Sequence, residues 1–161
     1  MCQLAATKID YEFVPEASIV NFYPLNSSMG GHLDDAEHDL TKPIVSISLG
    51  RSSIFLMGGR QKTADPIPIL ARSGDIVIMS GESRYCYHGV PCIISRELEK
   101  ELCSEVLPNF DECVESPDED TRHVLRYLQD HRINMNVRQV KIENEIWVEK
   151  TGTGHVKYPL Y

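Results

Sequence analysis

The chain has 161 residues, 42% of them hydrophobic and 25% charged, and its formal net charge is −8 at pH 7. This length is sufficient for a sizeable core, so we expect residues 1–161 to fold as a single domain. The sequence has no run of about 18 apolar residues and no secretory signal pattern. It therefore predicts an intracellular protein of the nucleus, cytoplasm or mitochondrion that neither spans a membrane nor is secreted.

The acidic charge is concentrated in one insertion. Residues 97–120 contain ten acidic side chains and one basic side chain, whereas the rest of the chain holds 15 basic and 14 acidic residues. A net negative charge counts against nucleic acid as a partner, since phosphate binding needs a positive surface. Outside this insertion the chain is close to neutral, so the negative charge counts against nucleic acid binding by the insertion and not by the rest of the chain.

The five cysteines are an odd number without a CxxC pair. This pattern argues against a disulfide framework and against a four-cysteine zinc site, and it favours reduced thiols. Cys86 and Cys92 flank a histidine, His88, and we predict that they are small buried hydrophobic residues and not metal ligands.

The first predicted strand covers residues 18–23, which are β-branched and aromatic and are followed by Pro24. Residues 26–31 contain serine and glycine and predict a turn that leads directly to His32.

Further short apolar segments follow at regular spacing, and each is bounded by glycine, proline or polar residues. They cover residues 43–49, 53–57, 66–70, 75–79 and 84–89. The first two are expected to form a β-hairpin because only a tight turn separates them. The whole series predicts a β-sandwich or barrel.

The last part of the chain is more varied. Residues 96–120 are charged and include two prolines, so we expect a mobile insertion outside the core. Residues 121–129 have apolar side chains at helical spacing and predict a short helix. Residues 132–140 alternate between apolar and polar side chains and predict a strand, and residues 146–154 predict a final edge strand.

His32 and Asp34 are candidate metal ligands. They lie two apart, so on an extended segment their side chains point to the same side. His88 is the candidate third ligand, and two histidines with one carboxylate favour non-haem Fe(II) with open coordination positions. The alternative is that the short HxD motif occurs by chance and that His88 is a half-buried imidazole on a strand.

The strand at 132–140 has one strongly polar face. Arg132, Asn134, Asn136 and Arg138 share this face, opposite Ile133, Met135 and Val137. An exposed strand face is one interpretation. The other is an arginine directed into a pocket, where a dicarboxylic ligand would supply the matching charge.

The sequence resembles the AlkB family of Fe(II)- and 2-oxoglutarate-dependent dioxygenases, most closely its AlkB homologue 1 subgroup. The resemblance covers roughly residues 19–140. It is carried by the segments Asn21-Phe22-Tyr23, His32-Leu33-Asp34, Lys42–Gly59, Ser73–Gly81, Ser83-Arg84, Tyr87-His88-Gly89 and Arg132–Arg138.

This resemblance implies a mainly β fold, a double-stranded β-helix or jelly roll with a few short helices. It implies that His32, Asp34 and His88 are the catalytic iron ligands and that 2-oxoglutarate and O2 are co-substrates. Oxidative removal of a methyl group, with release of formaldehyde, is the implied reaction.

The resemblance also implies the residues that bind 2-oxoglutarate. Tyr23 and Arg132 would hold its distal carboxylate. Asn21, Asn134 and Arg138 would hold its metal-chelating end.

The implied substrates are N-methylated bases in nucleic acid, with tRNA carrying N1-methyladenine first and single-stranded or damaged DNA second. The base must be exposed or flipped to reach the metal. Two departures are the asparagine at 136, where the family usually has threonine, and a short segment before Val14, where the family has a lid that grips the nucleotide. Two alternatives remain: a hydroxylase of proteins or small molecules, favoured by the net charge, and a noncatalytic module that binds a partner through residues 97–120.

Overall fold

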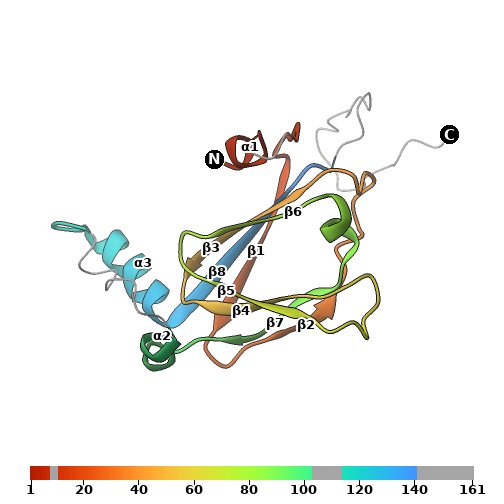
Figure 1. Ribbon diagram of the computed structural model, residues 1–161. Helices are drawn as coiled ribbons and strands as arrows, with labels where there is room; N and C mark the ends of the chain where they lie inside the picture. Colours follow the sequence, from red (N-terminus) through yellow and green to blue (C-terminus); the bar gives the residue numbers. More distant parts are fainter. Residues whose placement is uncertain (8–10, 103–113, 141–161) are drawn as a thin grey trace, which may run out of the picture.

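The computed structural model describes residues 1–7, 11–102 and 114–140. Its strands form two four-stranded antiparallel sheets that face each other, with helices at the periphery (Figure 1). This arrangement confirms the predicted mainly β jelly roll with a few short helices. Among the described residues, no helix is long and apolar enough to cross a membrane.

The first sheet has the strand order β1-β8-β3-β6 and the second has the order β2-β7-β4-β5. The strands are β1 Ala17–Pro24, β2 Met29–His32, β3 Ile44–Gly50, β4 Ser53–Met57, β5 Ile67–Ala71, β6 Ile76–Met79, β7 His88–Ile93 and β8 His131–Arg138. The helices are α1 Cys2–Thr7, α2 Arg96–Leu102 and α3 Glu119–Asp130, and a short 3-10 helix, η1, covers Gly81–Tyr85.

Several predicted elements are confirmed. β1 ends at Pro24, as expected from the ring that removes a backbone donor, and β8 occupies most of the predicted strand at 132–140. The predicted helix at 121–129 is α3, and the Asp118 side chain caps it by accepting a hydrogen bond from the backbone N–H of Thr121.

The predicted hairpin between residues 43–49 and 53–57 is wrong. β3 pairs with β6 and β8, whereas β4 pairs with β5 and β7, so the chain crosses from one sheet to the other between them. Gly50 has a φ of +78°, and a Cβ there would lie 2.2 Å from the carbonyl oxygen of His131. A hairpin turn and a crossing of this kind carry the same glycine signal, so the short spacing alone does not distinguish them.

Two boundaries near the candidate ligands also differ from the prediction. Residues 29–31, expected in a turn, are part of β2, where a register irregularity against β7 precedes His32. Arg84 and Tyr85, expected in a strand, lie in η1, so His88 begins β7 and does not end an earlier strand.

The acidic insertion is partly helical and is anchored to the core. α2 begins at Arg96, and Glu99 on this helix is 4% exposed, so this part is not outside the core as predicted. Residues 103–113 and the predicted edge strand at 146–154 lie outside the described residues. The single domain over residues 1–161 therefore stays a prediction.

Apolar side chains form two clusters, one on each side of the first sheet. The inner cluster fills the space between the sheets and includes Tyr23, Phe55, Met79 and Val90. The outer cluster includes Ala6 and Phe13 together with Val45 and Ile47 of β3, so the N-terminal segment covers the outer face of this sheet.

The described cysteines Cys2, Cys86 and Cys92 are free thiols, in agreement with the predicted reduced state. The prediction that Cys86 and Cys92 are buried is wrong, because Cys86 is half-buried and Cys92 is exposed. Cys92 lies on β7, and a strand position that faces outward has the same neighbours in the sequence as one that faces inward.

Candidate metal and co-substrate site

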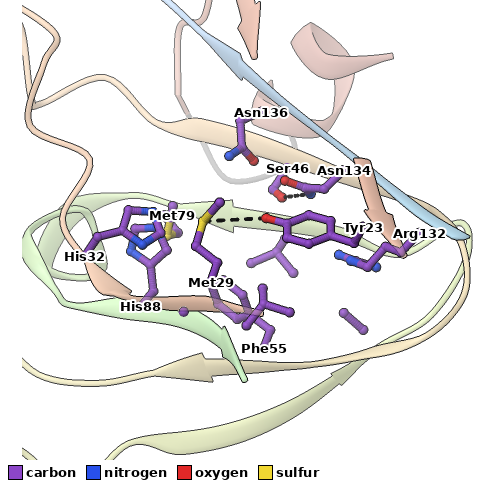
Figure 2. A pocket seen from close by; sticks show the side chains of 14 residues that line it. Tyr23, Met29, His32, Ser46, Phe55, Met79, His88, Arg132, Asn134 and Asn136 are labelled. Atoms are coloured by element: carbon purple, nitrogen blue, oxygen red, sulfur yellow. Dashed lines mark hydrogen bonds between the residues drawn. The ribbon is translucent and has the colours of Figure 1, made fainter. Parts of the chain in front are cut away.

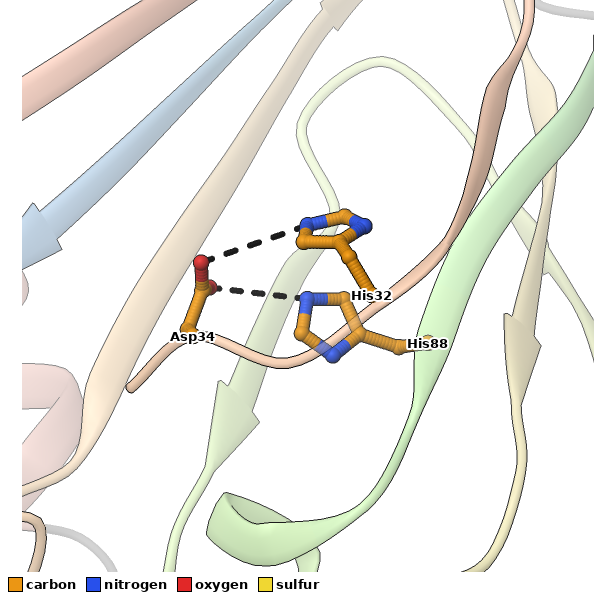
Figure 3. A group of neighbouring side chains, drawn as sticks. All are labelled: His32, Asp34 and His88. Carbon is orange, nitrogen blue, oxygen red and sulfur yellow. Dashed lines mark ion pairs between the residues drawn. The ribbon is translucent and has the colours of Figure 1, made fainter. Parts of the chain in front are cut away.

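The candidate ligands His32, Asp34 and His88 come together at one place. His32 ends β2, His88 begins β7 beside it in the same sheet, and Asp34 lies in the loop after β2 (Figure 3). One ligand atom from each residue lies within 4.8 Å of the others. The predicted same-side placement of His32 and Asp34 therefore holds, and His88 joins them across the β2–β7 pair.

Both histidines turn the same ring nitrogen toward the carboxylate. The Nδ1 atom of His32 lies 3.0 Å from the carbonyl oxygen of Gly30, and that of His88 lies 3.3 Å from the carbonyl oxygen of Cys86. The Nε2 atoms lie 4.0 Å and 3.5 Å from the Asp34 carboxylate, respectively. A backbone carbonyl on the other ring nitrogen is the usual support of a metal-binding histidine, because it fixes the tautomer and the ring orientation.

Asp34 is held in its charged form. Burial alone raises the pKa of this carboxyl group, but His88 and the positive charge of Arg138 outweigh burial and lower the pKa to about 2. The buried Oδ2 atom of Asp34 has no hydrogen-bond partner among the described residues. A buried carboxylate oxygen that lacks a partner is suited to accept a cation.

A pocket extends from the histidines into the space between the sheets. His32 and His88 lie at one end, and Tyr23 and Arg132 lie at the other (Figure 2). The apolar part of its lining consists of Met29, Phe55, Ala71, Val77, Met79 and Val90. The pocket therefore joins a candidate metal centre to a guanidinium group through a largely apolar interior.

Arg132 is buried and its guanidinium is mostly unpaired. Its Nη2 donates a hydrogen bond to the hydroxyl of Ser48 at 2.9 Å, whereas Nε and Nη1 have no hydrogen-bond partner in the described part of the chain. Burial lowers the pKa of Arg132, and the neighbouring Tyr23 opposes this change. For Tyr23, burial raises the pKa of the hydroxyl, so the group stays protonated and able to donate.

The polar face of β8 points inward, and the alternative of an exposed strand face is wrong. Arg132, Asn134 and Arg138 are all buried, whereas Met135 and Val137 on the opposite face contact the outer cluster. Asn134 donates hydrogen bonds to the hydroxyl of Ser46 and to the backbone of β3.

The remaining predicted co-substrate residues lie next to this face. Tyr23 pairs with Arg132 across β1 and β8, and Asn21 pairs with Asn134, so the register sets each beside its expected partner. Arg138 differs, because its guanidinium pairs with Asp34 at 2.8 Å and with Glu37. Asn21 and Arg138 are not among the described residues that line the pocket.

Four residues of this site were not predicted from the sequence. Ser46 and Ser48 alternate with apolar residues on β3, and this alternation was a usable signal that both point inward. Glu37 and Arg84 gave no such signal, because a carboxylate in an acidic loop and an arginine in a turn are usually exposed.

Comparisons with known proteins agree with this geometry. A family model described as the 2OG-Fe(II) oxygenase superfamily matches residues 1–138. The chain is 42% identical over 153 residues to the DNA N(6)-methyladenine demethylase ALKBH1A of Arabidopsis thaliana, covering 87% of this chain and 40% of that protein. It is 34% identical over 126 residues to the tRNA demethylase abh1 of Schizosaccharomyces pombe, covering 78% of this chain and 37% of that protein.

A solved structure, that of OsALKBH1, is also similar, with a TM-score of 0.57 and 25% identity. This likeness covers 80% of the present chain and 50% of the solved one. The chain spans about two fifths of the length of these two curated relatives, 40% and 37% respectively.

Proposed function

The chain belongs to the 2OG-Fe(II) oxygenase superfamily, and from this premise we propose that it catalyses the oxidative demethylation of N-methylated bases in nucleic acid. The observation that carries the proposal is the pocket with His32 and His88, the neighbours of Asp34, at one end and the mostly unpaired guanidinium of Arg132 at the other. The co-substrate that bridges such groups must offer a metal-chelating end and a carboxylate.

We propose Fe(II) as the metal held by His32, Asp34 and His88. Two imidazoles and one carboxylate match the ligand preference of a non-haem Fe(II) centre with open positions. The buried, unpartnered Oδ2 atom of Asp34 supports the same assignment. The two histidines must be neutral and Asp34 charged for this role, and the guanidinium of Arg138, 2.8 Å from the Asp34 carboxylate, favours the second condition.

We propose that Arg132 and Tyr23 hold the distal carboxylate of 2-oxoglutarate. The two unpaired donors of Arg132 and the protonated hydroxyl of Tyr23 support this assignment, since a carboxylate accepts from both. Asn21, Asn134 and Arg138 are proposed to act near the metal-chelating end. The present pairing of Arg138 with Asp34 supports a role close to the metal.

When bound, Fe(II) with 2-oxoglutarate and O2 supplies the oxidation that hydroxylates an N-methyl group, whose product then releases formaldehyde. The chain's own contribution is to bind the metal and 2-oxoglutarate, to orient the side chains that hold them, and to keep water out of the site. Phe55 and Met79 are apolar side chains in the lining of this pocket, and we propose that they limit the access of water. Ser46 orients the amide of Asn134, and Ser48 orients the guanidinium of Arg132.

The substrate class is proposed from the relatives. Their names include a tRNA demethylase and a DNA N(6)-methyladenine demethylase, so a methylated base in tRNA or in single-stranded DNA is the proposed target. Because the chain spans about two fifths of these relatives, 40% and 37%, the proposal concerns the chemistry that this part performs. The predicted compartment stays a prediction.

The test measures two products, succinate from 2-oxoglutarate and formaldehyde from RNA that contains N1-methyladenosine. We expect both to require added iron and to disappear in His32→Ala. His38→Ala is the matched control, because His38 is an exposed histidine in the same loop and should leave both unchanged. Turnover that persists in His32→Ala or without iron contradicts the proposal.

The net charge of −8 favours one alternative, a hydroxylase of proteins or small molecules. Binding of a methylated oligonucleotide that strengthens steeply at low salt argues against this alternative, because the slope counts phosphate contacts. Decarboxylation of 2-oxoglutarate that depends on iron excludes the noncatalytic module.

A further inference from the structure

A buried network of two arginines and two carboxylates includes the candidate metal ligand Asp34. Glu37 forms ion pairs with both Arg84 and Arg138, and Arg138 also pairs with Asp34 at 2.8 Å. Arg84 donates a further hydrogen bond to the backbone carbonyl of Asp34. The network thus joins η1, the end of β8 and the loop after β2 around one candidate metal ligand.

The network is deeply buried and balanced in charge. The side chains of Arg84 and Glu37 are 1% and 4% exposed, and two positive groups face two negative ones. Removal of one member leaves the buried charges unbalanced, which is costly, so the ion pairs stabilise this arrangement of the four groups.

This arrangement sets the orientation of the Asp34 carboxylate. Arg138 occupies Oδ1, whereas Oδ2 has no hydrogen-bond partner and faces Nε2 of His88 at 3.5 Å. Oδ1, the oxygen that Arg138 contacts, also lies 4.0 Å from Nε2 of His32. The carboxylate therefore faces both histidines, and the contact of Arg138 with Oδ1 fixes its orientation and leaves Oδ2 open on the side of His88. Arg138 in turn is held from its other side by Glu37.

We propose that Glu37 is a positioning residue for the metal ligand Asp34 and acts through Arg138, with Arg84 fixing Glu37 in place. This proposal rests on the proposed function in taking Asp34 as a metal ligand. Residues that hydrogen-bond to metal ligands typically change metal affinity by about 10- to 100-fold when they are replaced. Glu37 does not contact Asp34 itself but contacts Arg138, which in turn contacts Asp34. Its effect on Asp34 is therefore transmitted by the guanidinium of Arg138, which pairs with both carboxylates.

The first test is the binding of Mn²⁺ to the metal-free protein by titration calorimetry, because Mn²⁺ accepts the same oxygen and nitrogen ligands without oxidation. We expect Glu37→Gln to weaken Mn²⁺ binding by about tenfold or more. Glu82→Gln is the matched control, since Glu82 also pairs with an arginine, Arg60 at 2.7 Å, but is 84% exposed. The control should bind Mn²⁺ as the wild type does, and unchanged affinity in Glu37→Gln overturns the proposal.

The second test asks whether Glu37 acts through Arg138. In a double-mutant cycle, Glu37→Gln should add no further loss of Mn²⁺ affinity once Arg138→Met is present. Losses that add independently overturn the proposed route.

A third variant covers the case in which Glu37→Gln does not fold. Arg84→Met combined with Glu37→Leu replaces a buried ion pair by apolar side chains of similar size, a change that proteins often tolerate. We expect this double variant to fold and to bind Mn²⁺ about tenfold or more weakly than the wild type. A folded double variant with wild-type affinity overturns the proposal.

The two proposals fail in different ways. Absence of Mn²⁺ binding in the wild type contradicts the proposed function, because the metal centre itself is then missing. Normal binding in the wild type and in the Glu37 variants contradicts only the positioning role.

Discussion

Arg51 and Arg132 lie equally deep near the point where the chain leaves β3, with 5% and 3% of their surfaces exposed. Arg51 donates hydrogen bonds through Nε and Nη2 to the carbonyl oxygen of Ile94 and forms an ion pair with Glu99 at 3.4 Å. The guanidinium of Arg132 donates to Ser48, and two of its nitrogen atoms have no partner among the described residues. One buried guanidinium is satisfied by the protein and the other is not.

The difference separates a structural charge from a binding charge. Arg51 links α2 to the crossing between β3 and β4, at the end of the sandwich where α2 and α3 lie (Figure 1). Arg132 lines the pocket that also contains His32 and His88. A buried charge without partners is costly, so its retention in a pocket points to a ligand of opposite charge.

The largest expected effect comes from Glu99→Leu. This change leaves Arg51 buried without its carboxylate, and we expect the free energy of unfolding to fall by about 3–5 kcal/mol. Urea denaturation of the metal-free protein measures it. Glu101→Leu on the exposed side of the same helix is the control and should change the stability little. Equal losses in the two variants would show that Arg51 does not depend on Glu99.

Arg132→Met should impair the use of 2-oxoglutarate and not the stability of the protein, in contrast to Glu99→Leu. The change removes the guanidinium that is proposed to bind the distal carboxylate of 2-oxoglutarate. We expect kcat/KM for 2-oxoglutarate to fall roughly a hundredfold or more, since a charge-assisted bond contributes about 1.5–3 kcal/mol. The free energy of unfolding should stay the same or rise, because an unpaired buried charge is lost.

Arg72→Met, at an exposed arginine that pairs with Asp75, is the control for this variant and should leave both quantities unchanged. A large loss of stability in Arg132→Met with normal use of 2-oxoglutarate would mean that Arg132, like Arg51, has a structural role.

Ser48→Ala tests the single partner that Arg132 does have. We expect the free energy of unfolding to fall by about 1.5–3 kcal/mol, the range for a hydrogen bond to a charged group. Saturation with Mn²⁺ and 2-oxoglutarate should restore part of this stability in thermal unfolding. Ser53→Ala is the control, since the buried hydroxyl of Ser53 has no hydrogen-bond partner and its removal costs little. If Ser53→Ala lowers the free energy of unfolding more than Ser48→Ala does, the stabilising role of the hydrogen bond between Ser48 and Arg132 is contradicted.

Tyr23→Phe should have the smallest effect of the series. Within the described part of the chain its hydroxyl donates a weak hydrogen bond to the sulfur of Met29, at 3.5 Å, so the stability of the ligand-free protein should hardly change. The KM for 2-oxoglutarate should rise by about tenfold or less, the equivalent of one hydrogen bond of about 1 kcal/mol. Tyr127→Phe on α3 serves as the control. An unchanged KM in Tyr23→Phe removes Tyr23 from the proposed carboxylate site.

Local patterns were sufficient for much of the fold. The alternation of residues 132–138 predicted β8 and its two faces, and the apolar spacing of residues 121–129 predicted α3. These elements depend on the period of side-chain direction along the chain, which neighbouring residues reveal. The period of side-chain direction does not reveal to which sheet a strand belongs. The sequence therefore predicts one hairpin for β3 and β4, although the two strands lie in different sheets.

For the site, the sequence by itself determined which residue types were available: His32 and Asp34 at a spacing of two, His88, and an arginine on a polar strand face. Only the tertiary structure decided that this face is buried and that Nε and Nη1 of Arg132 have no hydrogen-bond partner among the described residues. It also decided that Glu37 and Arg84 form an ion pair close to Asp34. Burial and pairing of a charge depend on segments far apart in the chain, such as Arg84 and Glu37 with a separation of 47. Their contact exists only once the two sheets have closed on each other.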